Sequence, residues 1–356
     1  MDAIQEWLGT ETGFQTAASL VKVLVIANSL LGVVALMTWI ERRLSAIMQF
    51  RVGPNRVGPA GLFQPVADGI KFIWKQDIIP RDAYKPLFVL APLMSLVPAI
   101  VAFSAIPIGP TIEVFGRRVN LVINDWSAGI LFVLAITSLG VYGIVMAGWA
   151  SRSKYSLIGG LRSSAQMVSY ELALGISLMG VLMVSGTLRP TEIVELQGGW
   201  FWNWNAFTGG WQLVGFLVFL VAIFAETNRL PFDMPEAESE LVAGYHTEYS
   251  AMKFSMFFMA EYVNMITGAA MAVTLFLGGW QVGLPLEAWG ISGWPLWIAQ
   301  IAAFAAKVGF FLILFVWVRW TLPRFRYDQL MALGWKRMFP LALANIILTA
   351  ILVAFR

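Results

Sequence analysis

The sequence has no cysteine and a single histidine, His246, among its 356 residues. Without thiols the chain can form no disulfide and can hold no iron–sulfur cluster, and one imidazole cannot ligate both faces of a haem. We therefore expect no metal site and no bound redox cofactor in this chain. Any electrons that it uses must come from a partner.

Charged residues are also scarce. They make up 13% of the chain, against 58% hydrophobic residues, and these proportions exclude an ordinary soluble domain and indicate a polytopic membrane protein. The formal net charge of +3 comes from basic residues in short connections, which are typical topology signals, so we expect no nucleic-acid partner. The first residues, MDAIQEWLGTETGF, lack the pattern of a cleaved signal peptide, and we expect them to lead into the first span.

Eight apolar stretches approach the roughly 20 residues that a helix needs to cross a membrane. The odd-numbered connections between them contain 18 of the 24 Lys and Arg residues, which places these connections in the cytoplasm and both termini on the periplasmic side. We expect one all-α integral membrane domain over residues 1–356, with cytoplasmic loops at about 41–85, 150–163, 227–253 and 320–338. The predicted spans, of which the fifth and eighth are short, are 17–40, 86–108, 128–149, 164–185, 211–226, 254–278, 296–319 and 339–355.

The first cytoplasmic loop contains a further helix in GLFQPVADGIKFIWKQD. Apolar Phe63, Val66, Ile70 and Ile73 recur at spacings of three and four, and the intervening positions are polar, which is typical of an amphipathic helix. The stretch is too short to span, so it lies either in the membrane interface or as a lid on the bundle. Either arrangement offers an apolar surface at headgroup depth.

Glu171, Glu261 and Lys307 lie inside predicted spans, where a charge costs about 2.5 to 3.5 kcal/mol. The two acids fall in the cytoplasmic half of the membrane and the lysine falls near its middle. Buried groups of this kind exchange protons near neutral pH because burial shifts their pKa values. A proton path explains all three residues, and the alternative is a buried Glu–Lys ion pair that only fixes helix packing.

The stretch ETNRLPFDMPEAESELVAGYHTEYS, residues 226–250, concentrates acids against one cation, Arg229. Asp233 and Glu236 have the spacing of a capping box at a helix start. Capping does not account for the other acids, and close carboxylates of this kind bind or relay cations, of which protons are the simplest. The acids of this stretch are Glu226, Asp233, Glu236, Glu238, Glu240 and Glu248.

Five segments in order along the chain resemble one family, the quinone-chamber membrane subunit of respiratory complex I, which is the H-type subunit in bacteria and subunit 1 in mitochondria. They cover nearly the whole chain, whereas the outer loop 186–211 carries no such motif. The segments are WIERRLSAIMQFRVGPNRVGPAGLFQPVADGIKF (39–72), SRSKYSLIGGLRSSAQMVSYE (151–171), ETNRLPFDMPEAESELVAGYHTEYSAMKF (226–254), AEYVNM (260–265) and VRWTLPRFRYDQLM (318–331).

The resemblance implies eight transmembrane helices beneath peripheral subunits that carry the terminal iron–sulfur cluster, NADH and FMN. It also implies a quinone, most simply ubiquinone, as substrate, antiporter-like membrane subunits as partners, contact with membrane lipid, and a bacterial inner membrane or its mitochondrial equivalent. By this resemblance Glu41, Arg42 and Arg43 line the chamber mouth, with Phe63 on the interfacial helix at its entrance. The implied acidic path comprises Glu171, Glu226, Asp233, Glu236, Glu238, Glu240, Glu248 and Glu261, to which we add Arg229 and Lys307 as counter-ions.

Three other functions share some of these features. A proton-coupled secondary transporter would bind its solute deep in the bundle, often at broken helices, whereas the polar motifs here concentrate near one face. The anchor subunit of a related membrane-bound hydrogenase would need no quinone entrance. A passive anchor would need no acidic stretch.

Overall fold

The computed structural model describes residues 11–114, 116–208, 210–235 and 238–355. Each of the eight predicted spans coincides with a helix. In this part of the chain seven helices are long and apolar enough to cross a membrane, while α8, at 15 residues or about 22 Å, is shorter. The eight helices are α2 (Glu11–Met48), α4 (Lys85–Ala102), α5 (Gly129–Ala150), α6 (Lys154–Ser185), α8 (Gln212–Glu226), α10 (Ala251–Phe276), α11 (Trp294–Thr321) and α13 (Phe339–Ala354).

The last helix is longer than predicted. A short helix α12 (Tyr327–Ala332) and a π-helical turn (Leu333–Met338) run directly into α13, so that one helical segment extends from Tyr327 to Ala354. The basic pair Lys336–Arg337 made the predicted span begin too late, because exposed charged side chains continue a helix without interrupting its backbone hydrogen bonds.

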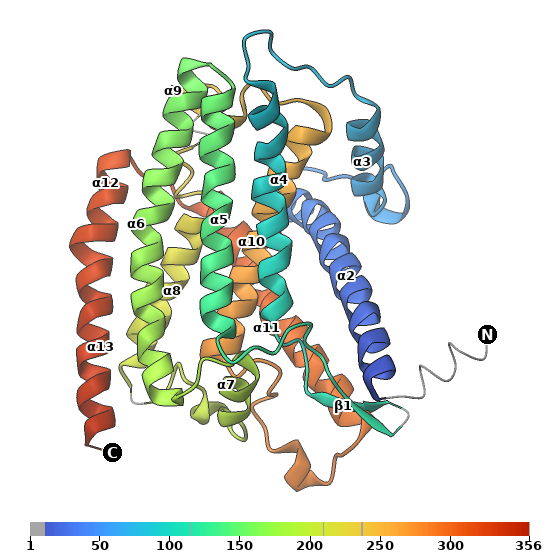
Figure 1. The fold of residues 1–356 in the computed structure, drawn as a ribbon, viewed down its shortest axis with the longest axis vertical. Helices are drawn as coiled ribbons and strands as arrows, with labels where there is room; N and C mark the ends of the chain where they lie inside the picture. The colour runs from blue at the N-terminus through green and yellow to red at the C-terminus, as the bar shows by residue number, and fades with distance from the viewer. Residues whose placement is uncertain (1–10, 115, 209, 236–237, 356) are drawn as a thin grey trace.

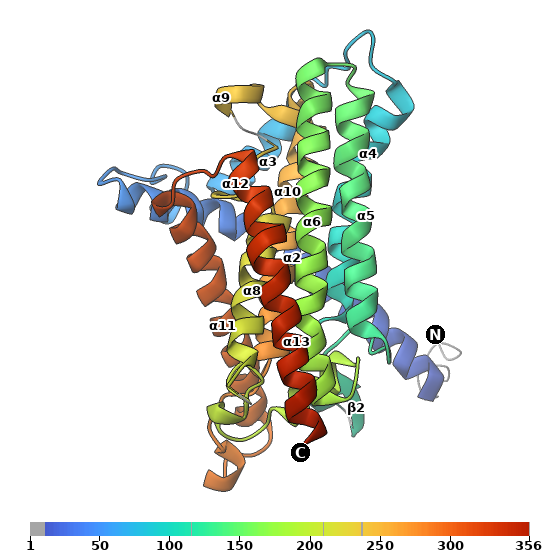
Figure 2. The same ribbon diagram turned by 90° about the vertical axis from the view of Figure 1, so that its left-hand side faces the viewer.

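The helices form one bundle around α10, the most deeply buried of them (Figures 1 and 2). Helix α4 packs on α5, α5 on α6, and α6 on α8 and α13. Helices α2 and α11 lean against this group, and α2 is the most exposed. The connections 49–84, 151–153 and 227–250 gather at one end, whereas α2 begins and α13 ends at the other end.

The predicted amphipathic helix is present as α3 (Gln64–Trp74), beside the loop end of α2. Its apolar face is open: Phe63, Val66, Ile70 and Ile73 are each at least half exposed.

Several elements were not predicted. At the end opposite the loops the first outer connection forms a hairpin of β1 (Thr111–Val114) and β2 (Arg117–Asn120), and α7 (Pro190–Leu196) follows α6. These pieces are too short to show a periodic pattern, so the expectation of a purely helical chain was incomplete. Short 3-10 turns (59–61, 103–105, 201–203, 244–246 and 286–289) and a four-residue helix α9 (Glu238–Leu241) complete the described elements.

Glycines let the central helices approach closely. A Cβ on Gly143 of α5 would lie 2.2 Å from Ser95 Oγ and 2.9 Å from the Ala91 carbonyl oxygen, both on α4. A Cβ on Gly148 of α5 would lie 2.6 Å from the carbonyl oxygen of Ser156 on α6. Small residues at such crossings are the usual means by which membrane helices pack.

We expect Gly143→Ala to lower the free energy of unfolding by about 1 to 3 kcal/mol, because α4 must move to admit the methyl group. Unfolding of the detergent-solubilised protein measures this. The matched control is Gly175→Ala on α6, where a Cβ would have no neighbour within 4 Å, so the same substitution should leave stability unchanged or slightly higher. Equal stability of the two variants would contradict the close α4–α5 contact.

Candidate functional site

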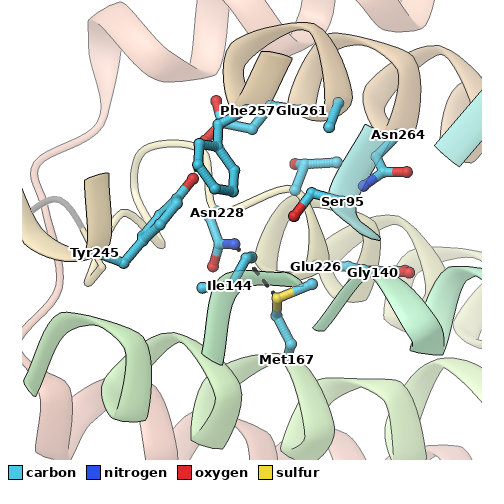
Figure 3. Close-up of a pocket in the computed structure, with 12 residues that line it drawn as sticks. Ser95, Gly140, Ile144, Met167, Glu226, Asn228, Tyr245, Phe257, Glu261 and Asn264 are labelled. Atoms are coloured by element: carbon cyan, nitrogen blue, oxygen red, sulfur yellow. Dashed lines mark hydrogen bonds between the residues drawn. The ribbon is translucent and has the colours of Figure 1, made fainter. Parts of the chain in front are cut away.

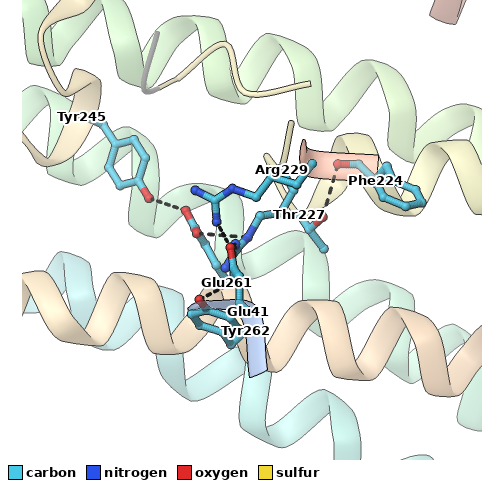
Figure 4. Close-up of polar contacts among 8 residues, drawn as sticks. Glu41, Phe224, Thr227, Arg229, Tyr245, Glu261 and Tyr262 are labelled. Carbon is cyan, nitrogen blue, oxygen red and sulfur yellow. Dashed lines mark hydrogen bonds and ion pairs between the residues drawn. The ribbon is translucent and has the colours of Figure 1, made fainter. Parts of the chain in front are cut away.

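A buried carboxylate, Glu41 of α2, is the centre of a network of charges near the loop end of the bundle (Figure 4). Arg229 Nη1 donates to both of its oxygens, at 3.1 and 3.2 Å. Arg319 of α11 donates to Oε1, and the Tyr262 hydroxyl of α10 donates to Oε2 at 2.6 Å. One carboxylate thus joins α2, α10, α11 and the connection that follows α8.

The guanidinium of Arg229 has partners on two sides (Figure 4). Besides Glu41, its Nε lies 3.8 Å from Glu261 Oε2, and its carbon lies 4.4 Å from the centroid of the Tyr262 ring. Burial by itself lowers the pKa of Arg229, but the charges of Glu41 and Glu261 outweigh burial and raise it, so the side chain stays protonated. Two acids, Glu41 and Glu261, therefore balance two arginines, Arg229 and Arg319.

The segment 227–233, which carries Arg229, is held by Gln166 of α6. Gln166 is fully buried, and its Nε2 lies 2.7 Å from the carbonyl oxygens of both Ala225 and Phe232 and 3.1 Å from Asn228 Oδ1. A backbone turn inside a membrane protein needs partners of this kind because lipid supplies none. Gln166 thereby fixes the place from which Arg229 reaches Glu41.

The same segment is tied to the connection after α11. Arg324 Nη2 donates to Asp233 Oδ2 at 2.8 Å, and the Phe325 amide donates to the Pro231 carbonyl at 3.2 Å. The ring of Phe232 packs against those of Phe325 and Tyr170. The segment after α8 and the one after α11 therefore form one layer.

The remaining acids of the stretch are more peripheral. Glu240 pairs with Arg162 of α6 at 2.6 Å and is largely exposed, and Glu248 is half-buried. Glu236 lies outside the described residues, as does the capping box that it would form with Asp233. The side chain of Glu238, the first residue of α9, also lies outside what the structure describes.

Two further acids lie deeper, Glu226 at the end of α8 and Glu171 on α6. The two carboxylates are close enough to interact electrostatically. Each also has a hydroxyl of α5 beside it: Ser138 donates a hydrogen bond to Glu171, and Thr137 lies within hydrogen-bonding reach of Glu226. A carboxylate pair with adjacent hydroxyls can share and pass a proton.

Two small voids flank Glu226, each of about 20 Å³, which is room for one water molecule. The first also touches Glu261 and Tyr245, which lie across it from Glu226 (Figure 3). The second extends beside Thr137 and Thr267. Each void borders polar atoms that are buried without a hydrogen-bond partner among the described residues. They are Ser95 Oγ and Asn264 Oδ1 beside the first void, and Asn264 Oδ1 and Thr267 Oγ1 beside the second.

Lys307 is not brought to these acids. Its ammonium donates to the carbonyl oxygens of Leu277, Gly279 and Gln281 at 2.7, 3.2 and 2.6 Å, and it lies 4.0 Å from the centroid of the Trp204 ring. These groups belong to the connection after α10 and to the outer loop. Lys307, near the middle of α11, thus lies beside the end of α10.

The residues expected at the chamber mouth connect α2 to α3 and to the loop before it. Arg42 Nη1 donates to Asp68 Oδ2 at 2.6 Å, and Arg43 Nη1 donates to the Ala60 carbonyl at 2.9 Å. Phe63 packs over Gly58, where a Cβ would lie 2.2 Å from the ring. Partial burial raises the pKa of Asp68, but the hydrogen bond and charge of Arg42, with help from Lys71, outweigh it, so that the pKa is lowered.

Sequence reasoning missed several members of the site. The polar residues Arg162, Gln166, Tyr262, Arg319 and Arg324 all contact a predicted acid or the segment that holds one. All lie within the five motif segments, so a list of every Arg, Gln and Tyr in those segments would have included them. Their partners, up to 278 positions away along the chain, were not accessible from local patterns.

These observations define the class of protein: a polytopic helical membrane protein with a charge-compensated polar centre near one end and half-buried acids farther along its helices. A family model described as NADH dehydrogenase matches residues 21–350. The chain belongs to this family.

Individual relatives, all subunits of NADH-quinone oxidoreductase, align with almost the whole chain. The chain is 51% identical to an H-type subunit of NADH-quinone oxidoreductase from Koribacter versatilis, over 95% of this chain and 97% of that protein. It is 49% identical to NADH-quinone oxidoreductase subunit 8 of Rhodothermus marinus, over 93% and 95%. It is 51% identical to the H-type subunit of NADH-quinone oxidoreductase from Deinococcus deserti, over 95% and 84%. The chain is thus similar over nearly its whole length to the H-type members of this family.

We expect Glu41→Gln to destabilise the protein by about 3 kcal/mol or more, because it leaves the buried Arg229 and Arg319 without their shared counter-charge. Unfolding of the detergent-solubilised protein measures the change. The control is Glu113→Gln, whose partner Arg118 lies 3.8 Å away on the exposed hairpin, and an effect below about 1 kcal/mol is expected there. If Glu41→Gln lowered the free energy of unfolding no more than the control does, Glu41 would not be the counter-charge that stabilises Arg229 and Arg319.

We expect Asp68→Asn to loosen α3 from α2 and to speed amide hydrogen exchange in α3 about two- to fivefold, the effect of losing an exposed ion pair. Because the pKa of Asp68 is depressed, the pairing is fully present above the ordinary value of 3.8 and is lost as the pH falls through the lower folded value. Asp82→Asn, in the same loop but without an ion pair among the described residues, is the control. Equal rates of amide hydrogen exchange in α3 in both variants would show that the Arg42–Asp68 ion pair does not hold α3 to α2.

Proposed function

We propose that this chain is the membrane subunit of a proton-translocating NADH:quinone oxidoreductase in which quinone binds near Glu41 and Arg229 and in which Glu261, Glu226 and Glu171 pass protons. The observation that carries the proposal is the identity of about half the residues to NADH-quinone oxidoreductase subunits along nearly the full chain. The names of these relatives favour this function over a transporter or a hydrogenase anchor.

In this proposal the chain crosses a bacterial inner membrane, or its mitochondrial counterpart, eight times. Helix α8 is included despite its length because it is enclosed by α6, α10 and α13 and need not match the thickness of the lipid alone. An even number of crossings agrees with the position of the start of α2 and the end of α13 at one end of the bundle. The opposite end, with the basic connections, faces the cytoplasm.

The quinone headgroup enters past α3 and the loop end of α2. A lipid-soluble ring can move along the open apolar face of Phe63, Val66 and Ile70 and reach the polar centre without crossing water. Arg229 Nη2 is buried there and has no acceptor among the described residues, which leaves it as a donor for a quinone carbonyl or for a water molecule beside it.

The acids form a route away from this centre. Glu261 pairs with Arg229 and borders the first void, Glu226 borders both voids, and Glu171 lies beyond it with Ser138. One water in each void would connect donors and acceptors that otherwise have no partner. Asp233, Glu240 and Glu248 form the cytoplasmic rim of the route, and Glu236 and Glu238 are assigned to it from their place in the sequence alone.

The chemistry follows from charge. Reduction of quinone to quinol takes two electrons and two protons, and in this proposal the electrons arrive from the terminal iron–sulfur cluster of a peripheral subunit that draws on NADH through FMN. The added negative charge beside Arg229 alters its pairing with Glu41 and Glu261. Protons then redistribute along Glu226 and Glu171 toward antiporter-like partner subunits.

We expect Glu226→Gln and Glu171→Gln each to reduce quinone-linked NADH oxidation and proton pumping at least about tenfold, because an amide cannot take up and release the proton. Rates and pumping are measured on the assembled complex in vesicles. NADH oxidation by a hydrophilic acceptor that bypasses quinone should be unchanged, which controls for the peripheral subunits.

The matched control is Glu195→Gln, which removes an exposed acid on α7 at the opposite end of the bundle. It should leave both activities intact. Normal rates and pumping in both the Glu226→Gln and the Glu171→Gln complexes would remove these residues from the route, while the family membership would stand.

A further inference from the structure

A groove remains between the start of α4, the end of α5 and the start of α6, outside the site described above. Its volume is about 690 Å³, and its lining includes Tyr84, Trp149, Arg152, Ser153, Lys154 and Leu157. It lies at the loop end of the bundle, where α5 turns into α6 (Figure 1). Neither the polar centre nor the route of acids uses any of these residues.

The groove is positively charged at the turn between α5 and α6. Arg152 and Lys154 are exposed, and neither makes an ion pair within the part of the chain that the structure describes. No described carboxylate lines the groove. Ser153, the residue before α6, makes no side-chain cap, so the helix dipole adds to the positive potential of the two cations. The groove is therefore complementary to an anion.

The walls of the groove are apolar and open to the side. Trp149 is 64% exposed, Tyr84 57% and Leu157 42%. Exposed apolar side chains continue away from the cations along both helices, with Tyr142 on α5 and Leu161 on α6. Rings such as Trp149 and Tyr84 at helix ends favour the headgroup layer of a membrane.

A ligand that fits this surface has a negative group next to a hydrocarbon chain. We propose that the groove binds one anionic phospholipid, with its phosphate against Arg152 and Lys154 and an acyl chain along the exposed face of α5 and α6. Basic pockets between membrane helices are known to hold such headgroups. A free phosphate would satisfy the cations but would leave the apolar wall uncovered, and a zwitterionic lipid would leave their charge uncompensated.

The test uses the complete complex, reconstituted in nanodiscs that contain either phosphatidylglycerol or only phosphatidylcholine, and counts the lipids that stay bound after extraction into detergent by native mass spectrometry. We expect one retained phosphatidylglycerol that Arg152→Gln with Lys154→Gln releases. Affinity should fall about 25-fold, since each basic side chain near an anionic lipid surface contributes about fivefold. Inorganic phosphate should not compete at millimolar concentrations.

Two further double variants serve as controls. Arg152→Lys with Lys154→Arg keeps the charges and should retain the lipid, whereas Lys336→Gln with Arg337→Gln removes two exposed cations of the π-helical turn and should also retain it. Equal lipid counts in the Gln pair and the unaltered complex would overturn the proposal. So would equal loss in both Gln pairs, displacement by phosphate, or loss of a partner subunit from the Arg152–Lys154 variant with its lipid count unchanged.

Discussion

The structure depends on the compensation of charge where water is excluded. Glu41 is buried, and a lone carboxylate there would be strongly unfavourable, so its oxygens are shared by Arg229, Arg319 and the hydroxyl of Tyr262. These partners come from three different parts of the chain. The requirement that their charges meet therefore fixes how α2, α10, α11 and the segment after α8 lie relative to one another. Loss of either arginine would leave two acids, Glu41 and Glu261, to share one compensating charge.

The segment 227–233 connects this centre to the acid on α10 and to the connection after α11. On one side Arg229 reaches Glu41 and Glu261, and on the other side Asp233 reaches Arg324. Gln166 donates to backbone carbonyls on either side of Arg229, those of Ala225 and Phe232. Under the proposed function, a negative charge that forms beside Arg229 would compete with Glu41 and Glu261 for this one guanidinium. The shared arginine would thereby link quinone reduction to the acids farther along the helices.

Close packing and small voids divide the interior into two kinds of region. Where Gly143 meets Ser95, or Gly148 meets the Ser156 carbonyl, the helices are too close to admit a Cβ atom on the glycine. Around Glu226 the helices stand apart enough for single water molecules, and the unpartnered oxygens of Asn264 and Thr267 point to where such water is needed. Under the proposed function, protons move through the second kind of region, because only there can water connect the polar side chains.

The sequence by itself determined the membrane class, the positions of the helices, the amphipathic α3 and the acid-rich stretch, because these follow from local periodicity and composition. It also placed the chain in its family through five ordered motifs. It could not determine which charges meet. Lys307 was expected beside the acids, yet it donates to the carbonyls of Leu277, Gly279 and Gln281, and Arg319 rather than Lys307 pairs with an acid. Only the tertiary structure decided such pairings, because the placement of the helices relative to one another determines which distant side chains come within a few ångströms, and the local pattern of residues does not record that placement.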